Sequence, residues 1–201
     1  MSLMAFALQV LPVSLMAVAA TLIGAALQVD RAWQLPLLLV GLLLFAAFVT
    51  FRRASGWNLA LLLALAVVAG VVLGSAFGDG QELGPVGALV LTFVLLAVAA
   101  LIGSVLRSRL RRVGFLLWTM AWVYLVGWVV SVPLDPAAEL RAAWAGAGLA
   151  IFLCLAVVYF SRLAIGEPGR GLAVAPGSDL YLVGLNVAIA LRILLHSLSV
   201  S

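Results

Sequence analysis

Few residues of this chain have side chains that could do chemistry, and four of them fall in its last apolar segment. These are Tyr181, Asn186, Arg192 and His196. Arg192 and His196 are four residues apart, so they share one face if the segment is helical. An ionisable pair inside an apolar segment predicts a gate or an anion contact, whereas an arginine that reaches outward to the membrane interface explains the same spacing. Asn186 either lines a pore or joins helices by hydrogen bonds.

Several kinds of chemistry are excluded by the residue types that the sequence lacks. Cys154 is its only cysteine and His196 its only histidine, which excludes an intrachain disulfide and argues against a Cys/His metal site. All 11 basic residues are arginines, so no lysine can form a retinal-type Schiff base or act as a general base. The sequence contains no hydrolase, zinc-protease or phosphate-binding motif. We therefore expect no enzymatic activity, no bound metal and no cofactor.

The elements that position these residues are predicted by composition and by the placement of charge. Apolar residues make up 67% of the chain and charged residues 9%, whereas soluble domains are about half apolar and about a quarter charged. The charges fall in short clusters between uncharged runs, each close to the roughly 20 residues that cross the hydrocarbon of a bilayer. We therefore predict an all-α integral membrane protein, a bundle of seven transmembrane helices in a single domain over residues 1–201. The predicted spans are residues 4–29, 33–51, 57–77, 86–106, 113–132, 142–161 and 180–198.

The placement of arginine predicts the side of the membrane on which each end lies. Because the number of spans is odd, the two ends lie on opposite sides, and eight arginines fall in the connections of one side against two on the other. Cytoplasmic connections carry the excess of arginine, so we predict a cytoplasmic amino terminus and an outer carboxyl terminus. Topology also explains the net charge of +4, without nucleic-acid binding. The eight are Arg52, Arg53, Arg107, Arg109, Arg111, Arg112, Arg162 and Arg170, and the two are Arg31 and Arg141.

Two further patterns predict the kind of cell and the membrane in which the chain lies. Arginine in place of every lysine, with abundant alanine, glycine and leucine, is typical of a GC-rich bacterial coding sequence. We therefore expect the chain in the inner (plasma) membrane of a bacterium. Trp33, Trp57 and Trp144 fall near predicted span ends, where indole rings favour the headgroup boundary.

Three glycines, Gly70, Gly74 and Gly78, recur every fourth residue in and just after the third predicted span. On a helix this spacing makes one face of small residues, which another helix backbone can approach closely. The approaching helix could belong to this chain or to a partner protein, and the sequence leaves both open.

Proline and glycine predict that the longest cytoplasmic connection comes just before the last helix. Residues 166–178 contain Pro168, Pro176 and four glycines, which disfavour a helix. Ser178 or Asp179 is then expected to cap the last helix.

The last span also carries a motif that resembles a known family. Tyr181, Leu182 and Asn186 stand where members of the Bax inhibitor-1 (transmembrane Bax inhibitor motif) family carry the same residues, and Arg192 comes one residue earlier than their arginine. Where the family has two aspartates, this chain has Val183 and Phe160. From about residue 87 to the carboxyl end, the order of helices and basic loops is similar to that of the bacterial branch of the family.

The resemblance implies a seven-helix bundle whose last helix is central and whose amino terminus is cytoplasmic. Several members of the family are described as pH-sensitive calcium or cation leaks latched by the two aspartates, and some bacterial members bind membrane proteases. Because both aspartates are absent, we expect an accessory or regulatory subunit that packs against other integral membrane proteins in the lipid bilayer. The alternative is a pH-modulated cation leak that uses Asn186 and hydroxyl groups of other spans. The candidate hydroxyl groups are those of Thr92, Ser104, Thr119 and Ser131.

Overall fold

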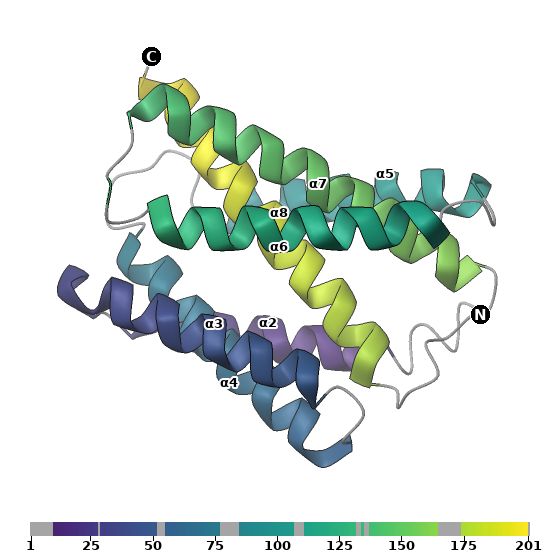
Figure 1. Cartoon of the computed structure of the whole chain (residues 1–201), viewed down its shortest axis with the longest axis horizontal. Coiled ribbons are helices and arrows are strands. Elements are labelled where there is room, and N and C mark those ends of the chain that lie inside the picture. The colour runs from purple at the N-terminus through teal and green to yellow at the C-terminus, as the bar shows by residue number, and fades with distance from the viewer. Residues whose placement is uncertain are drawn as a thin grey trace. The chain divides into compact units, whose positions relative to one another are not determined.

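The computed structural model describes residues 10–27, 29–51, 55–76, 85–106, 111–131, 134, 137–164 and 174–200. Within these ranges the chain forms seven α-helices and one short 3-10 helix, η1 (Figure 1). The prediction of an all-helical chain is therefore confirmed for the described residues. The elements are α2 (Leu11–Ala26), η1 (Arg31–Trp33), α3 (Gln34–Thr50), α4 (Ser55–Ala76), α5 (Pro85–Val105), α6 (Arg111–Ser131), α7 (Ala138–Ala164) and α8 (Val174–Val200).

Four of the described helices contain a segment long and apolar enough to cross a membrane. These segments have 18 to 26 residues, and a helix needs about 17 to 25 residues to span the hydrocarbon. Within the described residues, the apolar stretches of the other three helices have 10 to 17 residues, although α5 as a whole runs for 21 residues. By length and composition the chain is therefore a helical membrane protein. The long segments are Trp57–Gly74, Val113–Ser131, Glu139–Ala164 and Gly177–Leu195, and the shorter ones are Leu11–Ala26, Leu35–Thr50 and Val90–Val105.

The last helix begins earlier than the sequence predicts. It starts at Val174, so Ser178 and Asp179 lie inside it and the prediction that either caps its start is wrong. Pro176 is tolerated because a residue in the first helical turn has no intrahelical acceptor for an N–H group. Gly177 is retained in the helix because it packs closely against Val13 of α2. Of the predicted connection, residues 166–173 lie outside the described residues.

The chain divides into two compact units. The N-terminal unit, Ser2–Asp79 with Gly169–Tyr181, contains α2, η1, α3, α4 and the start of α8. Within it, α4 packs against both α2 and α3. Ala17, Phe48 and Leu62, one from each of these three helices, are at most 1% exposed and form part of its core.

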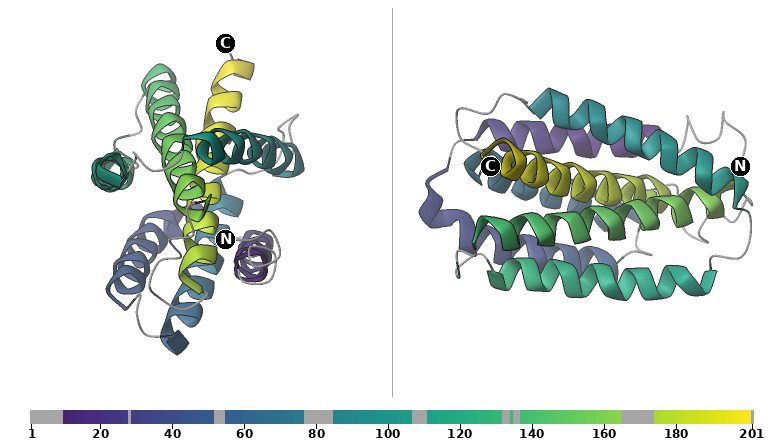
Figure 2. Two further views of the ribbon diagram at one scale, coloured as in Figure 1. Left: turned by 90° about the vertical axis from the view of Figure 1, so that its right-hand side faces the viewer. Right: turned by 90° about the horizontal axis from the view of Figure 1, so that it is seen from above.

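The C-terminal unit, Gly80–Pro168 with Leu182–Ser201, contains α5, α6, α7 and the rest of α8. Within it, α7 packs against both α5 and α6, and α6 and α7 lie side by side in Figures 1 and 2. Its hydrophobic core combines side chains of α6, α7 and α8. The buried core residues are Leu117, Ala121, Tyr124, Phe152, Leu155, Val158 and Val187.

Candidate functional site

The four predicted residues of the last segment all belong to α8, but the structure separates Tyr181 from Asn186 and Arg192. Tyr181 belongs to the N-terminal unit, whereas Asn186 and Arg192 belong to the C-terminal unit. Arg192 is partly buried within the apolar segment Gly177–Leu195. The side chain of His196 lies outside the described residues. The shared face that the spacing predicts for Arg192 and His196 therefore stays a prediction.

Tyr181 ties the start of α8 to α2. Its hydroxyl lies 2.6 Å from the Thr21 hydroxyl, and the Thr21 hydroxyl donates to the Ala17 carbonyl at 2.9 Å. A hydroxyl has one proton to donate, so Tyr181 is the donor to Thr21. The result is a directed chain of hydrogen bonds from α8 through Thr21 to the backbone of α2. Tyr181 is 4% exposed, so this contact is sealed inside the N-terminal unit.

A second hydroxyl of α2 holds the same part of α8. Ser14 Oγ lies 2.9 Å from the Gly177 carbonyl and 3.0 Å from the Val10 carbonyl, and its single proton is shared between them. A Cβ on Gly177 would lie 2.6 Å from Val13 Cβ, so only glycine lets the two helices approach this closely here. Sequence reasoning missed this contact. The available signal was the recurrence of small residues at intervals of three and four in α2, at Ser14, Ala17, Thr21 and Gly24.

Asn186 and the hydroxyl groups proposed to surround it mostly bond within their own helices. The Asn186 amide donates to the Leu182 carbonyl at 2.8 Å, one turn earlier in α8. Thr92 is buried at 5% exposure, whereas Ser104 and Thr119 are exposed. Three of the hydroxyl groups donate to a carbonyl of their own helix: Ser104 to Leu101, Thr119 to Phe115 and Ser131 to Trp128. Most of these side chains therefore form their hydrogen bonds with backbone carbonyls of their own helix.

The glycine face of α4 is covered by α2. A Cβ on Gly74 would lie 2.5 Å from the Ala25 carbonyl oxygen, and a Cβ on Gly70 would meet the Thr21 carbonyl. In return, Gly24 of α2 lies against the Val67 carbonyl of α4. The close approach is thus made within the chain, and a partner at Gly70 and Gly74 would first have to displace α2. Gly78 lies outside the described residues.

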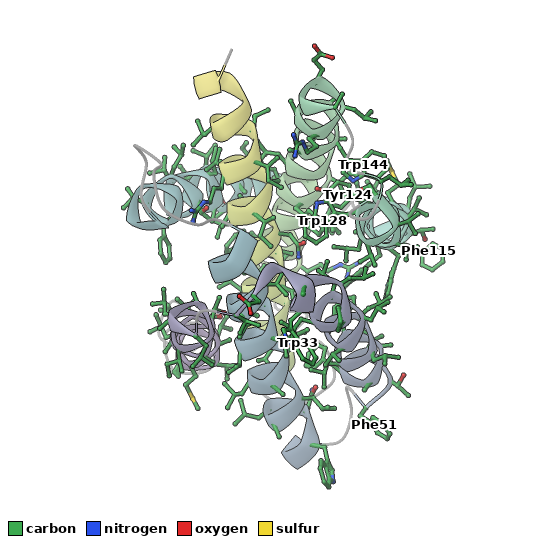
Figure 3. The ribbon with its side chains drawn as sticks, turned by 90° about the vertical axis from the view of Figure 1, so that its left-hand side faces the viewer. Trp33, Phe51, Phe115, Tyr124, Trp128 and Trp144 are labelled. Atoms are coloured by element: carbon green, nitrogen blue, oxygen red, sulfur yellow. The ribbon has the colours of Figure 1, made fainter. Side chains whose placement is uncertain are left out.

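A second glycine-dependent contact, which the sequence did not predict, joins α6 and α7. The rings of Tyr124 and Trp144 stack with centroids 5.6 Å apart and planes 16° apart (Figure 3). Each ring also covers a glycine of the opposite helix, Tyr124 over Gly148 and Trp144 over Gly127. Trp144 therefore packs between α6 and α7, and its buried Nε1 has no hydrogen-bond partner among the described residues.

The described residues contain no group of three or more His, Cys, Asp and Glu side chains that could hold a metal ion. No family model matches the chain, and no curated protein matches its sequence. The class of protein consequently rests on the helices themselves, which define a helical membrane protein with four segments able to cross a bilayer. Membership of the Bax inhibitor-1 family stays a prediction from the motif in α8.

Proposed function

We propose that this chain is an accessory or regulatory membrane subunit that packs against other integral membrane proteins. One observation carries the proposal: the hydrogen bonds of Tyr181, Ser14 and Asn186 hold helices together or stay within their own helix. Tyr181 and Ser14 join α8 to α2, and Asn186 donates within α8. Such bonds stabilise helix pairs by on the order of 1 kcal/mol each. The hydrogen bonds of these polar groups thus support the packing of helices against one another.

The directions of the helices support a chain that crosses the membrane repeatedly. In the N-terminal unit, Thr21 lies against Gly70 and Ala25 against Gly74, so α2 and α4 run parallel. In the C-terminal unit, Gly114 lies against Arg162 and Gly127 against Trp144, so α6 and α7 run antiparallel. When each helix crosses the membrane once, helices that follow one another in the sequence run in opposite directions, and every second helix runs in the same direction. Our proposal is therefore a seven-pass protein of a bacterial inner membrane, oriented by its arginines with the amino terminus in the cytoplasm.

Outward-facing apolar side chains provide the surface for lipid or for partner helices. Leu43, Leu101 and Phe115 are 69% to 79% exposed in the isolated chain, and Phe115 points away from the neighbouring helices in Figure 3. Such side chains are stable only against hydrocarbon or another apolar surface. A partner subunit would pack on these faces without rearranging the glycine contacts inside.

The test is to tag the protein at its native locus, extract it in mild detergent and identify by mass spectrometry what co-migrates with it on a sizing column. A tagged, unrelated multi-pass protein of similar abundance controls for non-specific association. A stoichiometric companion absent from the control is the expected result. A lone 21.0 kDa chain would contradict the proposal.

The cation leak is tested separately with purified protein in liposomes. The side-chain amide of Asn186 donates its hydrogen bond within α8, which gives this alternative less support than the accessory role. Calcium or proton flux that depends on pH and is lost in Asn186→Leu would favour the leak, whereas equal permeability of liposomes with and without the protein would remove it.

A further inference from the structure

The stacked rings between α6 and α7 leave one polar group without a hydrogen bond. The ring centroid of Trp144 lies 5.6 Å from that of Tyr124 (Figure 3), and the buried Nε1 of Trp144 has no hydrogen-bond partner among the described residues. A buried indole N–H usually has a partner, because a donor without one loses its bonds to water and gains none in return. The inward position of the ring therefore carries a cost that a second position would remove.

Trp144 lies close to the end of an apolar segment, where lipid headgroups begin. It is the sixth residue of the segment Glu139–Ala164, so at about 1.5 Å per residue it stands about 8 Å from the start of that segment. Glu139 and Arg141, which precede it, are exposed charged residues and favour a place for this end of α7 near water. At this depth water and headgroups offer acceptors to an indole N–H. A partner for Nε1 is thus available outside the helix pair.

The outer side of α7 beside Trp144 has room for its ring. Ala143 and Ala147 are exposed, and a Cβ on Gly146 would meet no atom within 4 Å. Side chains this small leave the surface of the helix open to the close approach of a larger group. A change of the Trp144 rotamer would turn the ring onto this surface without moving the backbone of α7.

The inward position of the ring depends on a glycine of the opposite helix. A Cβ on Gly127 would lie 2.7 Å from Cζ2 of Trp144 and 3.0 Å from its Cη2. These atoms belong to a rigid ring that moves only as a whole, so a methyl group at this position would press the ring away from α6. The ring is therefore held inward by its stack on Tyr124 and by the space that Gly127 leaves.

The contributions that separate the two positions of the ring oppose each other. The inward ring gains the stack with Tyr124, whereas the outward ring gains a hydrogen bond for Nε1, and the two gains are of similar size. The hydrophobic effect decides little between the positions, because lipid tails are as apolar as the side chains between the helices. The surroundings of Nε1 can therefore shift the balance.

We propose that Trp144 is a two-position contact that responds to the thickness of the bilayer. Its inward position closes α6 onto α7 over Gly127, and in its outward position Nε1 donates to water or to a lipid headgroup. A thinner hydrocarbon layer brings these acceptors closer to Trp144 and favours the outward position. Gly127 is then uncovered, which loosens α6 against α7 at this end. The response does not depend on the accessory role proposed for the chain.

The test places the full chain, with fluorotryptophan at its six tryptophans, in bilayers of dimyristoyl or dioleoyl phosphatidylcholine. The two lipids share a headgroup, and the first makes the thinner bilayer. Fluorine NMR follows the Trp144 resonance, which Trp144→Phe identifies, and the change in its chemical shift between light and heavy water measures contact of the ring with water. We expect more water contact at Trp144 in the thinner bilayer. Equal contact in the two bilayers would overturn the proposal.

Two glycine variants show whether the ring itself moves. Gly127→Ala should raise the ratio of outward to inward rings about ten-fold, as an overpacking cost of about 1.4 kcal/mol implies. Gly184→Ala is the matched control in the same unit, because a Cβ there would meet only Leu96 Cδ1, at 3.4 Å, and it should leave the ratio unchanged.

If Gly127→Ala increases the water contact of Trp144 no more than Gly184→Ala does, water enters while the ring stays in place, and the proposal is wrong. The comparison of the two bilayers uses the unsubstituted chain, so it decides the question even if Gly127→Ala does not fold.

Discussion

In the N-terminal unit, α2 and α4 touch through their backbones, whereas in the C-terminal unit α6 and α7 touch through aromatic rings. Glycine makes both contacts possible. At Gly70 the obstacle to a larger residue is the Thr21 carbonyl, and at Gly148 it is the ring of Tyr124. A carbonyl in a helix cannot move without moving the helix, but a ring can rotate away. The same residue type therefore predicts a rigid contact in one unit and an adaptable contact in the other.

The largest effect is expected for Gly70→Ala. The new methyl group must push α2 and α4 apart, and overpacking of this kind costs about 3 kcal/mol in the free energy of unfolding, at the upper end of its usual range. Unfolding by SDS titration in mixed micelles measures the loss. Gly41→Ala is the control in the same unit, because a Cβ there meets only Val68 Cγ1 at 3.5 Å. Equal losses in the two variants would show that the backbone contact is not limiting.

A smaller loss of about 1 to 2 kcal/mol is expected for Gly148→Ala, because Tyr124 can shift at the expense of its stack with Trp144. Its control is Gly146→Ala on the same helix, where a Cβ meets no atom within 4 Å. Combining Gly148→Ala with Tyr124→Leu should cost less than the sum of the single changes. Combining Gly70→Ala with Thr21→Ala should show no such rescue, since the obstacle is the backbone. If the second substitution reduced the loss in both units, or in neither, the distinction between a rigid and an adaptable contact would be contradicted.

Tyr181→Phe removes the hydrogen bond between α8 and Thr21 while keeping the ring. We expect a loss of about 1 kcal/mol in the free energy of unfolding. A double-mutant cycle with Thr21→Val isolates the contact, and additive losses would mean that the two hydroxyls do not interact.

The smallest effect is expected for Asn186→Leu, within about 0.5 kcal/mol, because an amide bonded to its own helix contributes little to tertiary stability. The same SDS titration measures it. A loss as large as that of Tyr181→Phe would show that Asn186 joins helices after all.

Much of the helical content could be predicted from the sequence because it follows from the spacing of charge. Uncharged runs near the length of a membrane crossing can satisfy their backbone groups only as helices. The start of α8 could not be predicted in this way. Pro176 and Gly177 have the local signals of a turn, and the contact of Gly177 with Val13 of α2 overrides them.

The partners of the candidate residues were harder to predict than the helices. The repeat of Gly70 and Gly74 predicts a close approach, but not that α2 makes it. Tyr181 was singled out by a resemblance, yet its partner Thr21 lies 160 positions away in the chain. Trp144 falls near a predicted span end in the sequence, which does not indicate that its ring packs over Gly127 of the opposite helix.

The hydroxyls of α2 also have a consequence for the order of assembly during synthesis. Ser14 and Thr21 each have an acceptor one turn earlier in their own helix, at Val10 and Ala17. As α2 leaves the ribosome, both hydroxyls can therefore be satisfied alone in the bilayer. The groups of α8 that they hold are translated 163 and 160 residues later. Helix α2 can thus be inserted with its hydroxyls satisfied, and the N-terminal unit is completed when α8 is inserted.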